Sequence, residues 1–258
     1  MRHARVTKKG SNNVIDVTVA DTGALLTSYG ETLAMDQINW LPPVANPGTV
    51  FALGLNYADH ASELEFKAPT DPLVFLKGRN TLTGHLQPAA RPDDIDFMHY
   101  ECELGVVMGK AARYVSQENA MDYVAGYTVC NDFAIRDYLE NYYRPNLRVK
   151  SRDSLCPIGP WLVDRDDVTD ISNLKLTTTV NGKITQEGTT ADMIFSVPFV
   201  IEYLSRIMTL SPGDIIATGT PKGVVDMQPG DSVCCEIESI GALITPIVSW
   251  QEFYGVDY

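Results

Sequence analysis

Runs of apolar and β-branched residues, bounded by turn residues, dominate the hydrophobic pattern of this chain. Such runs are typical of strands. The clearest case is a hairpin over residues 174–186, because Asn181-Gly182 suits a type I′ turn. The pattern predicts strands over the following residues: 14–19, 49–55, 98–108, 126–131, 174–180, 183–186, 214–218 and 232–248.

Helical patterns are few. They predict helices over the following residues: 59–66, 116–123, 133–143 and 194–208, the last being the longest. Ser116 is the expected N-cap of the second of these helices. Strands and helices do not alternate regularly, so the pattern indicates a β-rich, mixed α+β fold. The proline-rich stretch 41–48 predicts a boundary between a small N-terminal β region, 1–45, and a catalytic domain, 46–258.

Composition narrows the function classes. The 258 residues carry a formal charge of −13, which argues against a nucleic-acid partner because phosphate binding needs a basic face. No apolar run reaches the roughly 18 residues of a membrane helix, and no apolar stretch follows the charged start as in a secretory signal. The five cysteines show no C-x-x-C spacing. Reduced thiols in a cytoplasmic protein are therefore expected.

Two carboxylates two residues apart, Glu101 and Glu103, give the strongest chemical signal. On a strand they share a face, and the apolar residues that follow indicate a core-facing element. Like charges that close repel each other, and a divalent cation relieves the repulsion. Oxygen ligands favour Mg²⁺, Mn²⁺ or Ca²⁺ over zinc. An exposed charged strand, or pairing with Lys or Arg, is the alternative. Asp132, at the end of a predicted strand, is a third candidate ligand, although it could instead cap the next helix.

His60 and Glu63 are three residues apart, so on a helix a carboxylate could orient an imidazole as a general base. A solvated helix face is the alternative interpretation. The glycine-rich run 213–223 could hold an oxyanion, but it lacks the P-loop spacing, and neither a Rossmann fingerprint nor a G-x-S-x-G motif is present. Cations near element ends could bind an anionic substrate or lie at the surface: Lys77, Arg136, Lys150 and Lys222.

In these motifs the chain resembles the fumarylacetoacetate hydrolase family over residues 46–248. The stretches that carry the resemblance are 54–60, 76–77, 99–105, 127–137, 149–153 and 214–223. The likeness is greatest to the branch of the family that acts in homoprotocatechuate (4-hydroxyphenylacetate) catabolism, through residues 51–64, 80–84, 121–153 and 188–199.

The resemblance implies the family's mixed β-sandwich roll, a homodimer and one divalent cation per subunit, Mg²⁺ or Mn²⁺ with Ca²⁺ as a further candidate. By position, the metal ligands are expected to be Glu101, Glu103 and Asp132. The expected catalytic residues are His60, Glu63 and Lys150. The expected substrate-binding residues are Lys77, Arg136, Gly219 and Thr220.

The implied activity is a decarboxylase, an isomerase or both, acting on a small 2-oxo or 2-hydroxydienoate di- or tricarboxylic acid through a metal-stabilised enolate. Some members of the family carry two tandem copies of this unit, whereas this sequence contains one. A second subunit of the same family is therefore a candidate partner. The alternatives are an acylpyruvate hydrolase or oxaloacetate decarboxylase of the same family, and a non-catalytic metal-binding β module.

Overall fold

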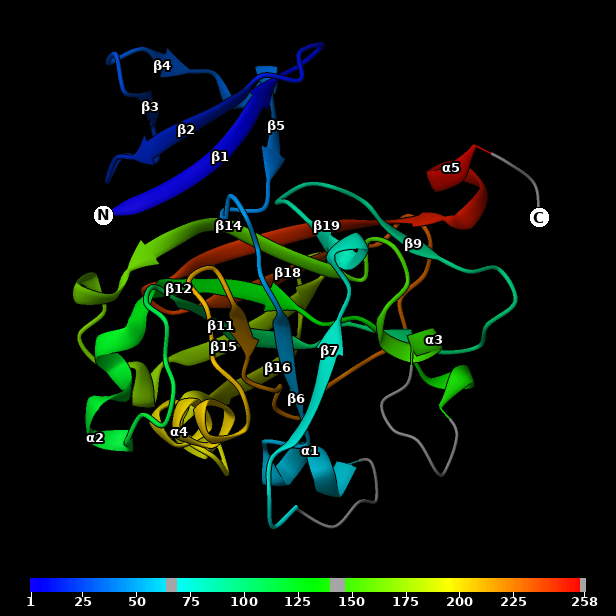
Figure 1. Cartoon of the computed structure of the whole chain (residues 1–258). Helices are drawn as coiled ribbons and strands as arrows, with labels where there is room; N and C mark the ends of the chain where they lie inside the picture. Colours follow the sequence, from blue (N-terminus) through cyan, green and yellow to red (C-terminus); the bar gives the residue numbers. More distant parts are fainter. Residues whose placement is uncertain (64–68, 140–146, 256–258) are drawn as a thin grey trace.

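The computed structural model describes residues 1–63, 69–139 and 147–255 of the chain. Strands make up most of its regular structure, and they form two large mixed sheets with a few short helices around them (Figure 1). The β-rich α+β class expected from the sequence is therefore confirmed. Among the described residues, no helix is long and apolar enough to cross a membrane.

The larger sheet has 12 strands, and its central strands carry most of the candidate site. Its main path runs in the order β4 (Thr32–Leu33), β3 (Leu25–Thr27), β2 (Val14–Val19), β1 (Arg2–Lys8), β14 (Cys156–Asp164), β12 (Val124–Asn131), β11 (Cys102–Met108), β17 (Ile215–Ala217), β6 (Val50–Gly54) and β7 (Leu73–Lys77). β5 (Ile38–Leu41) also pairs with β1, and β8 (Leu82–Thr83) with β14. The β6–β17 and β8–β14 pairs are parallel, whereas the other pairs are antiparallel.

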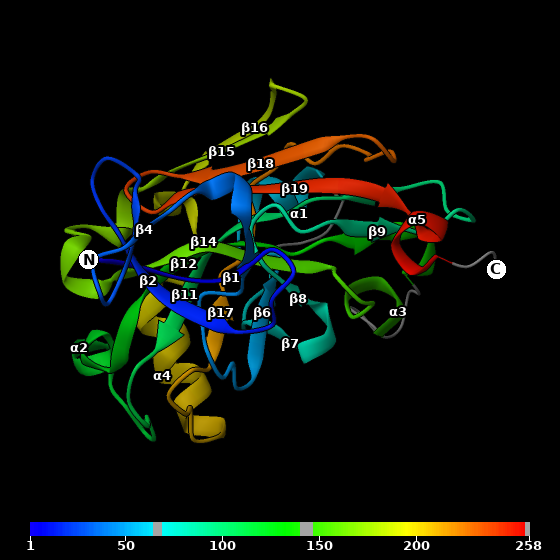
Figure 2. The ribbon, with the colours of Figure 1, turned by 90° about the horizontal axis from the view of Figure 1, so that it is seen from above.

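The second sheet has five strands and lies along one side of the first (Figure 2). Its order is β16 (Lys183–Thr189), β15 (Lys175–Val180), β18 (Ser232–Ile237), β19 (Gly241–Ser249) and β9 (Ala89–Arg91). A separate two-stranded ladder joins β10 (Met98–His99) to β13 (Ala134–Ile135). The helices are α1 (Ala58–Glu63), α2 (Gln117–Ala120), α3 (Leu147–Lys150), α4 (Val197–Ile207) and α5 (Trp250–Tyr254).

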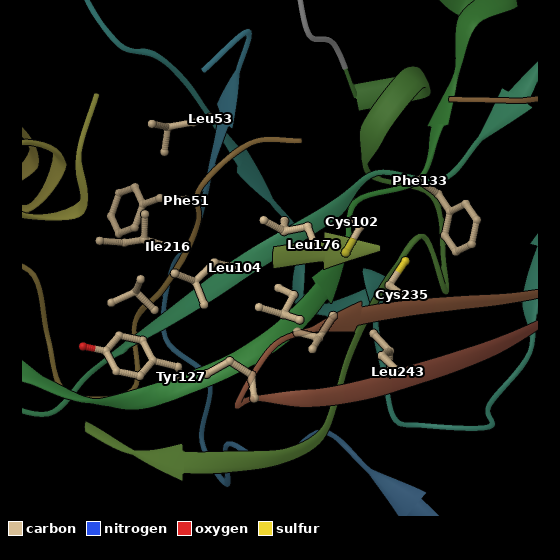
Figure 3. Close-up of a cluster of buried hydrophobic side chains, with 14 of the residues drawn as sticks. Phe51, Leu53, Cys102, Leu104, Tyr127, Phe133, Leu176, Ile216, Cys235 and Leu243 are labelled. Carbon is tan, nitrogen blue, oxygen red and sulfur yellow. The ribbon is translucent and has the colours of Figure 1, made fainter. Parts of the chain in front are cut away.

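Apolar side chains from the facing sheets form the main core. Leu104 of β11 and Tyr127 of β12 belong to the same buried cluster as Leu176, Cys235 and Leu243 of the second sheet (Figure 3). Burial of large apolar side chains is the main favourable term in folding. A smaller cluster holds the N-terminal strands together, and these strands lie at the top of Figure 1. β1 pairs with β14, so they continue the larger sheet.

The 174–186 hairpin is confirmed. β15 and β16 pair from Val180 to Lys183, and the two turn residues, Asn181 and Gly182, have φ angles of 51° and 79°. Two successive positive φ angles define the type I′ turn, whose twist matches that of the strands it joins. The strands predicted over 14–19, 49–55, 126–131 and 214–218 are also present, with ends that differ by up to two residues.

Two predicted strands are each divided in two. The strand expected over 98–108 separates into β10 and β11, because Tyr100 and Glu101 leave the ladder and the backbone N–H of Glu101 donates to the side chain of Asn131. The strand expected over 232–248 is the β18–β19 hairpin. Its turn contains Ser239, whose φ of 63° reverses the chain.

The helix predicted over 133–143 is wrong in its described part, and residues 140–143 lie outside the described residues. Phe133, Ala134 and Ile135 are all fully buried, and Ala134 pairs with His99 in the two-stranded ladder. Only one 3₁₀ turn follows, over 136–138. Asp132 therefore precedes a strand and is not a helix N-cap.

Two other helices, α4 and α2, are shorter than predicted. α4 begins at Val197 and not at residue 194, because Asn56 accepts the backbone N–H of Phe195 and Ser196 then caps the helix. In α2, Ser116 occupies the N-cap position, but its hydroxyl accepts from the side chain of Asn119 and not from the backbone. α1 ends at Glu63, and residues 64–66 of the predicted helix lie outside the described range.

Candidate metal centre and active site

Three buried carboxylates meet where β11 begins and β12 ends. Glu101 precedes β11, Glu103 lies within it, and Asp132 follows β12. The ladder aligns Cys102 with Asn131, so the flanking acids come to the same end, and the backbone N–H of Asp132 donates to the carbonyl of Glu101 over 2.9 Å. One oxygen from each carboxylate lies within 4.8 Å of those of the other two.

The carboxylate of Glu103 is only half satisfied. Its Oε2 accepts the backbone N–H of Gly219 over 2.7 Å, whereas Oε1 is buried without a hydrogen-bond partner in the described structure. Burial, followed by the charges of Asp132 and Glu101, raises the pKa of Glu103 well above its ordinary value. A buried charged oxygen with no partner is costly unless a cation binds it.

Lys150 of α3 neutralises the other two acids. Its Nζ lies 2.5 Å from Glu101 Oε2 and 2.9 Å from Asp132 Oδ2. Burial is the largest influence on Glu101 and would raise its pKa, but Lys150 and Arg136, with a smaller contribution from His60, together outweigh it and the pKa is lowered. Burial likewise would lower the pKa of Lys150, but Asp132 and Glu101 raise it. Both shifts favour the charged forms of Lys150 and Glu101.

Lys77, at the end of β7, adds a second buried ammonium group. It donates to Asp132 Oδ1 and, over 3.0 Å, to the carbonyl oxygen of Leu155. Its carboxylate partner is also the partner of Lys150, so Lys77 lies beside the acids and not at the surface.

The three acids fit a hard divalent cation. They offer only oxygen ligands, and they are buried: Glu101 is 6% exposed, and Glu103 and Asp132 are 0% exposed. The unpartnered oxygen of Glu103 needs a positively charged partner. Mg²⁺ and Mn²⁺ prefer carboxylate oxygens, whereas zinc sites usually include sulfur or imidazole. Glu101, Glu103 and Asp132 are thus the residues that could hold the cation.

The predicted dyad is formed. His60 Nδ1 lies 3.1 Å from Glu63 Oε2, and the imidazole is only 3% exposed. The other carboxylate oxygen of Glu63 accepts the backbone N–H of Gly223 over 2.9 Å. The charge of His60 also contributes to the lowered pKa of Glu101, after burial and the nearby cations, which indicates that the dyad lies close to the acids.

The loop over residues 218–223 connects the dyad with the acids. Gly219 donates to Glu103 at one end, and Gly223 donates to Glu63 at the other. Between them, the Thr220 hydroxyl accepts from Gln186 Nε2 over 2.9 Å. The predicted substrate-binding residues Gly219 and Thr220 are therefore fixed beside the site.

Arg136 lies at the edge of the same cluster. Its terminal nitrogen is 3.5 Å from Glu101 Oε1, and its Nε donates to His99 Nε2 over 2.7 Å. Burial and the charge of Arg136 hold the pKa of His99 well below its ordinary value. The structure thus brings together the expected metal-ligand, catalytic and substrate-binding residues, whereas the side chain of Lys222 is exposed. It adds His99 and Gln186, whose roles depend on contacts with residues 34 to 37 positions away.

Residues 49–248 match the fumarylacetoacetate (FAA) hydrolase C-terminal family. The chain belongs to this family. It is 66% identical over 206 residues to a 4-hydroxyphenylacetate degradation bifunctional isomerase/decarboxylase of Salmonella dublin, an alignment that covers 80% of this chain and 48% of that protein. It is 38% identical to the mitochondrial oxaloacetate tautomerase Fahd2a of Rattus norvegicus over 82% of this chain and 70% of the relative.

Solved structures of family members share the fold. A 5-carboxymethyl-2-hydroxymuconate delta-isomerase from Mycobacterium smegmatis superposes with a TM-score of 0.85 and 34% identity, covering 96% of this chain and 99% of that one. A maleylpyruvate hydrolase from Sphingobium, solved with manganese(II) and pyruvate, gives a TM-score of 0.82 at 26% identity over 96% and 99% of the two chains. This family member spans about half the length of the bifunctional relatives that it matches.

Proposed function

We propose that this chain is a divalent-metal-dependent isomerase, decarboxylase or both, acting on 2-hydroxydienoate or 2-oxo di- and tricarboxylic acids of homoprotocatechuate catabolism. The observation that carries the proposal is the unpartnered Glu103 oxygen among three buried carboxylates, in a chain 66% identical to a bifunctional isomerase/decarboxylase. The similarity to a full-length delta-isomerase structure supports isomerisation in particular.

The cation would be Mg²⁺ or Mn²⁺, held by Glu101, Glu103 and Asp132. When bound, such an ion supplies Lewis-acid stabilisation of negative charge on a carbonyl or carboxylate oxygen. The backbone N–H of Gly219 fixes the orientation of Glu103. Gln186 does the same for the Thr220 hydroxyl. Ligands and substrate contacts are thereby held before the substrate arrives.

His60 is the proposed proton shuttle. The carboxylate of Glu63 accepts from Nδ1 in the tautomer that leaves Nε2 free to take up a proton, and it stabilises the imidazolium that results. Moving a proton along a conjugated chain converts an enol diene into a 2-oxo-enoate, and the same base serves either reaction. Lys150 holds positive charge next to the acids and stabilises the negative charge that develops on the substrate.

Lys77, Arg136 and Thr220 are proposed to bind the carboxylates of the substrate. Arg136 is the most accessible of the cations in the cluster, with 20% of its side chain exposed, whereas Lys77 is fully enclosed. We therefore assign the distal carboxylate to Arg136 and a supporting electrostatic role to Lys77.

A hydrolase of acylpyruvates, or a tautomerase or decarboxylase of oxaloacetate, is the second candidate. The likeness to maleylpyruvate hydrolase and to oxaloacetate tautomerase supports it. These reactions use the same acids and a base in the position of His60. A non-catalytic metal-binding module is less well supported, because metal binding alone does not need the His60–Glu63 pair.

The proposal also places the protein in the cytoplasm as a homodimer, with a second family member as a candidate partner. The half-length match to the bifunctional relatives supports the candidate partner. Light scattering of the purified chain, alone and mixed with such a family member, tests the assembly.

The test of function separates the two reactions. Purified protein is assayed with Mg²⁺, with Mn²⁺ and after EDTA, on 2-hydroxyhepta-2,4-diene-1,7-dioate and on 5-oxopent-3-ene-1,2,5-tricarboxylate. Loss of the dienoate chromophore and release of CO₂ are followed independently. We expect turnover that EDTA abolishes, and a fall of at least about 100-fold in kcat for His60→Gln, since general base catalysis is worth about 10²–10⁴.

Glu236→Gln provides a matched control, because this strand glutamate is exposed on β18 and lies far along the chain from the acids. Its activity should equal that of the wild type. Full activity of Glu103→Gln in metal-free buffer would show the metal assignment to be wrong. Turnover of acylpyruvates or oxaloacetate, without any effect on the dienoate, would favour the second candidate.

A further inference from the structure

Arg136 has an unusual partner. Its Nε–H donates to Nε2 of His99 over 2.7 Å, and His99 is fully buried at the end of β10. A guanidinium group in a protein usually meets a carboxylate, which cancels its charge. Here an uncharged ring makes the closest contact, and the carboxylate of Glu101 lies farther away, at 3.5 Å.

The hydrogen bonds define the state of the ring. His99 Nδ1 lies 3.0 Å from the carbonyl oxygen of Tyr100, which can only accept, so Nδ1 carries the hydrogen. Nε2 faces an N–H of Arg136, which can only donate, so Nε2 presents its lone pair. The imidazole is therefore neutral, and it orients the guanidinium group without neutralising it.

The rest of the guanidinium group keeps its capacity to bind an anion. Among the residues that the structure describes, the nearest carboxylate oxygen is Glu101 Oε1, 3.5 Å from a terminal nitrogen, and Glu101 already pairs with Lys150 at 2.5 Å. The arginine side chain is 20% exposed, whereas those of its ionic neighbours are 7–8% exposed. An oriented, charged and partly accessible guanidinium group is suited to bidentate recognition of a carboxylate.

We propose that His99 is a positioning residue that holds the guanidinium group of Arg136 for the second carboxylate of the substrate, so that the site selects 2-oxo dicarboxylates over 2-oxo monocarboxylates. This inference rests on the proposed function, because it assumes that a 2-oxo acid occupies the site. An aspartate at position 99 would hold the same arginine but cancel its charge.

Binding of two matched probes tests the proposal without turnover. 2-Oxoadipate and 2-oxohexanoate have the same chain length and differ only in the terminal carboxylate. Calorimetry with Mg²⁺ present should show that the wild type binds 2-oxoadipate at least about 10-fold more tightly, because its terminal carboxylate forms a charge-assisted pair with the guanidinium group.

Two substitutions of His99 separate positioning from folding. Gln in place of His99 carries an acceptor at the position of Nε2 and can still hold Arg136, whereas Asn reaches only the position of Nδ1. His99→Asn should therefore lose about 10-fold in affinity for 2-oxoadipate and keep its affinity for 2-oxohexanoate. His99→Gln should stay within about 3-fold of the wild type for both probes.

A double substitution shows whether His99 acts through Arg136. Adding His99→Asn to Arg136→Ala should cause no further loss of 2-oxoadipate binding. Equal losses for both probes, equal effects of Asn and Gln, or additive effects in the double variant would overturn the proposal. A wild type that binds both probes equally would overturn the selectivity but leave the 2-oxo acid function standing. A wild type that binds neither probe would overturn both.

Discussion

The carboxyl group of Glu103 is subject to two opposing requirements. Binding a cation requires its negative charge, but in the metal-free fold that charge is buried next to Asp132 and Glu101. The raised pKa of Glu103 expresses this cost, because the folded state favours the protonated form. Stability and metal binding thus make contrary demands on one side chain.

Replacing Glu103 by Gln should therefore stabilise the metal-free protein at neutral pH. The folded pKa of Glu103 lies above its ordinary value of 4.5. Its contribution to stability is therefore full below about pH 4.5 and is lost as the pH rises through the folded pKa. In EDTA at pH 8, thermal unfolding should show a Tm at least about 2 °C above that of the wild type, the shift that about 1 kcal/mol gives in a chain of this size.

Added Mg²⁺ should make the wild type more stable than Glu103→Gln, the reverse of the order in EDTA. With the ion bound, the wild type gains stability by mass action, whereas Glu103→Gln gains less because it has lost a charged ligand. We expect the affinity for Mg²⁺ to fall at least about 10-fold. The exposed strand residue Glu236, changed to Gln, should alter neither measurement. A Glu103→Gln protein that is less stable than the wild type in EDTA would contradict this account.

The sequence predicts some site residues better than others, for a physical reason. Glu101 and Glu103 can be recognised because their spacing places two like charges in an apolar segment. This unfavourable arrangement is evident from residues 99–104 alone. His99 belongs to the same segment, but its role depends on Arg136, which is 37 residues away and arrives through β13. A local sequence pattern can reveal charges that need a counter-ion. A contact between residues far apart in the sequence can be identified only from the folded structure.

Among the elements, the loop over residues 218–223 depends on a single backbone geometry. Gly219 has a φ of 91°, and a β-carbon added there would lie 2.8 Å from the β-carbon of Asn56. Asn56 is itself held, since its amide donates to the carbonyl oxygens of Phe195 and Thr218. The loop therefore cannot move away without breaking these buried hydrogen bonds.

Gly219→Ala should destabilise the protein by about 2–4 kcal/mol, from the unfavourable φ and the steric overlap together. It should also weaken Mg²⁺ binding, because the displaced backbone N–H no longer orients Glu103. Chemical denaturation and metal titration measure the two effects. Gly230→Ala is the matched control, since Gly230 has a φ of 96° but open space around it, and only about 1–2 kcal/mol should be lost. Equal effects of the two substitutions would refute the steric argument.

His85 joins the N-terminal strands to the second sheet. Its ring packs edge-on against Trp40 of β5 at 5.1 Å, and its Nδ1 accepts the backbone N–H of Ile244 in β19. Burial lowers the pKa of His85 to about 4. The unfolded chain then binds a proton at a higher pH than the folded one, so stability is lost as the pH falls below about 6.5.

When the pH falls from 7.5 to 5.5, His85 should lower the unfolding free energy of the wild type by about 1 kcal/mol, a value that allows for partial exposure of the ring. His85→Asn keeps an acceptor for Ile244 but does not titrate. It should be less stable than the wild type at pH 7.5, and the difference in unfolding free energy should shrink as the pH falls. A difference independent of pH would exclude His85 as the titrating group.

Strands and turns could be predicted from the sequence where a single local motif determines the backbone conformation. The β15–β16 hairpin follows from Asn181-Gly182, which fixes both the turn and the register. By contrast, β14 contains Pro157, Gly159 and Pro160, residues that argue against a central strand, and yet it pairs with β12 and β1. The helix expected over 133–143 failed for a similar reason, because tertiary burial of residues 133–135 outweighed the local preference.

For the molecule as a whole, the net charge of −13 opposes an anionic substrate. Within the site, Lys77, Lys150 and Arg136 face three carboxylic side chains, and the raised pKa of one of them, Glu103, favours its uncharged form. The cations of the site therefore attract an anionic substrate at short range, whereas the net negative charge of the protein repels it at long range. Added salt screens the long-range part first, because the Debye length falls from about 30 Å at 10 mM to about 10 Å at 100 mM.

We expect kcat/KM for a di- or tricarboxylate substrate to rise at least about 2-fold when NaCl increases from 10 to 100 mM. A singly charged 2-oxo acid should show a smaller rise, since the effect scales with substrate charge. Steady-state kinetics at constant free Mg²⁺ measures it. A fall in kcat/KM over this range would mean that the cations of the site control the approach of the substrate.

The short loop that holds both Glu103 and Glu63 has a consequence for regulation by mass action. Gly219 and Gly223 are four residues apart, so Glu103, a proposed metal ligand, and Glu63 of the dyad accept hydrogen bonds from the same short segment of backbone. If one conformation of this loop favours both cation binding at Glu103 and the position of the His60–Glu63 dyad on α1, then cation binding and dyad position are linked by a single coupling free energy. Such coupling is reciprocal. A bound acid that draws His60 inward would then raise the affinity for the ion by the same factor by which the ion raises the affinity for the acid.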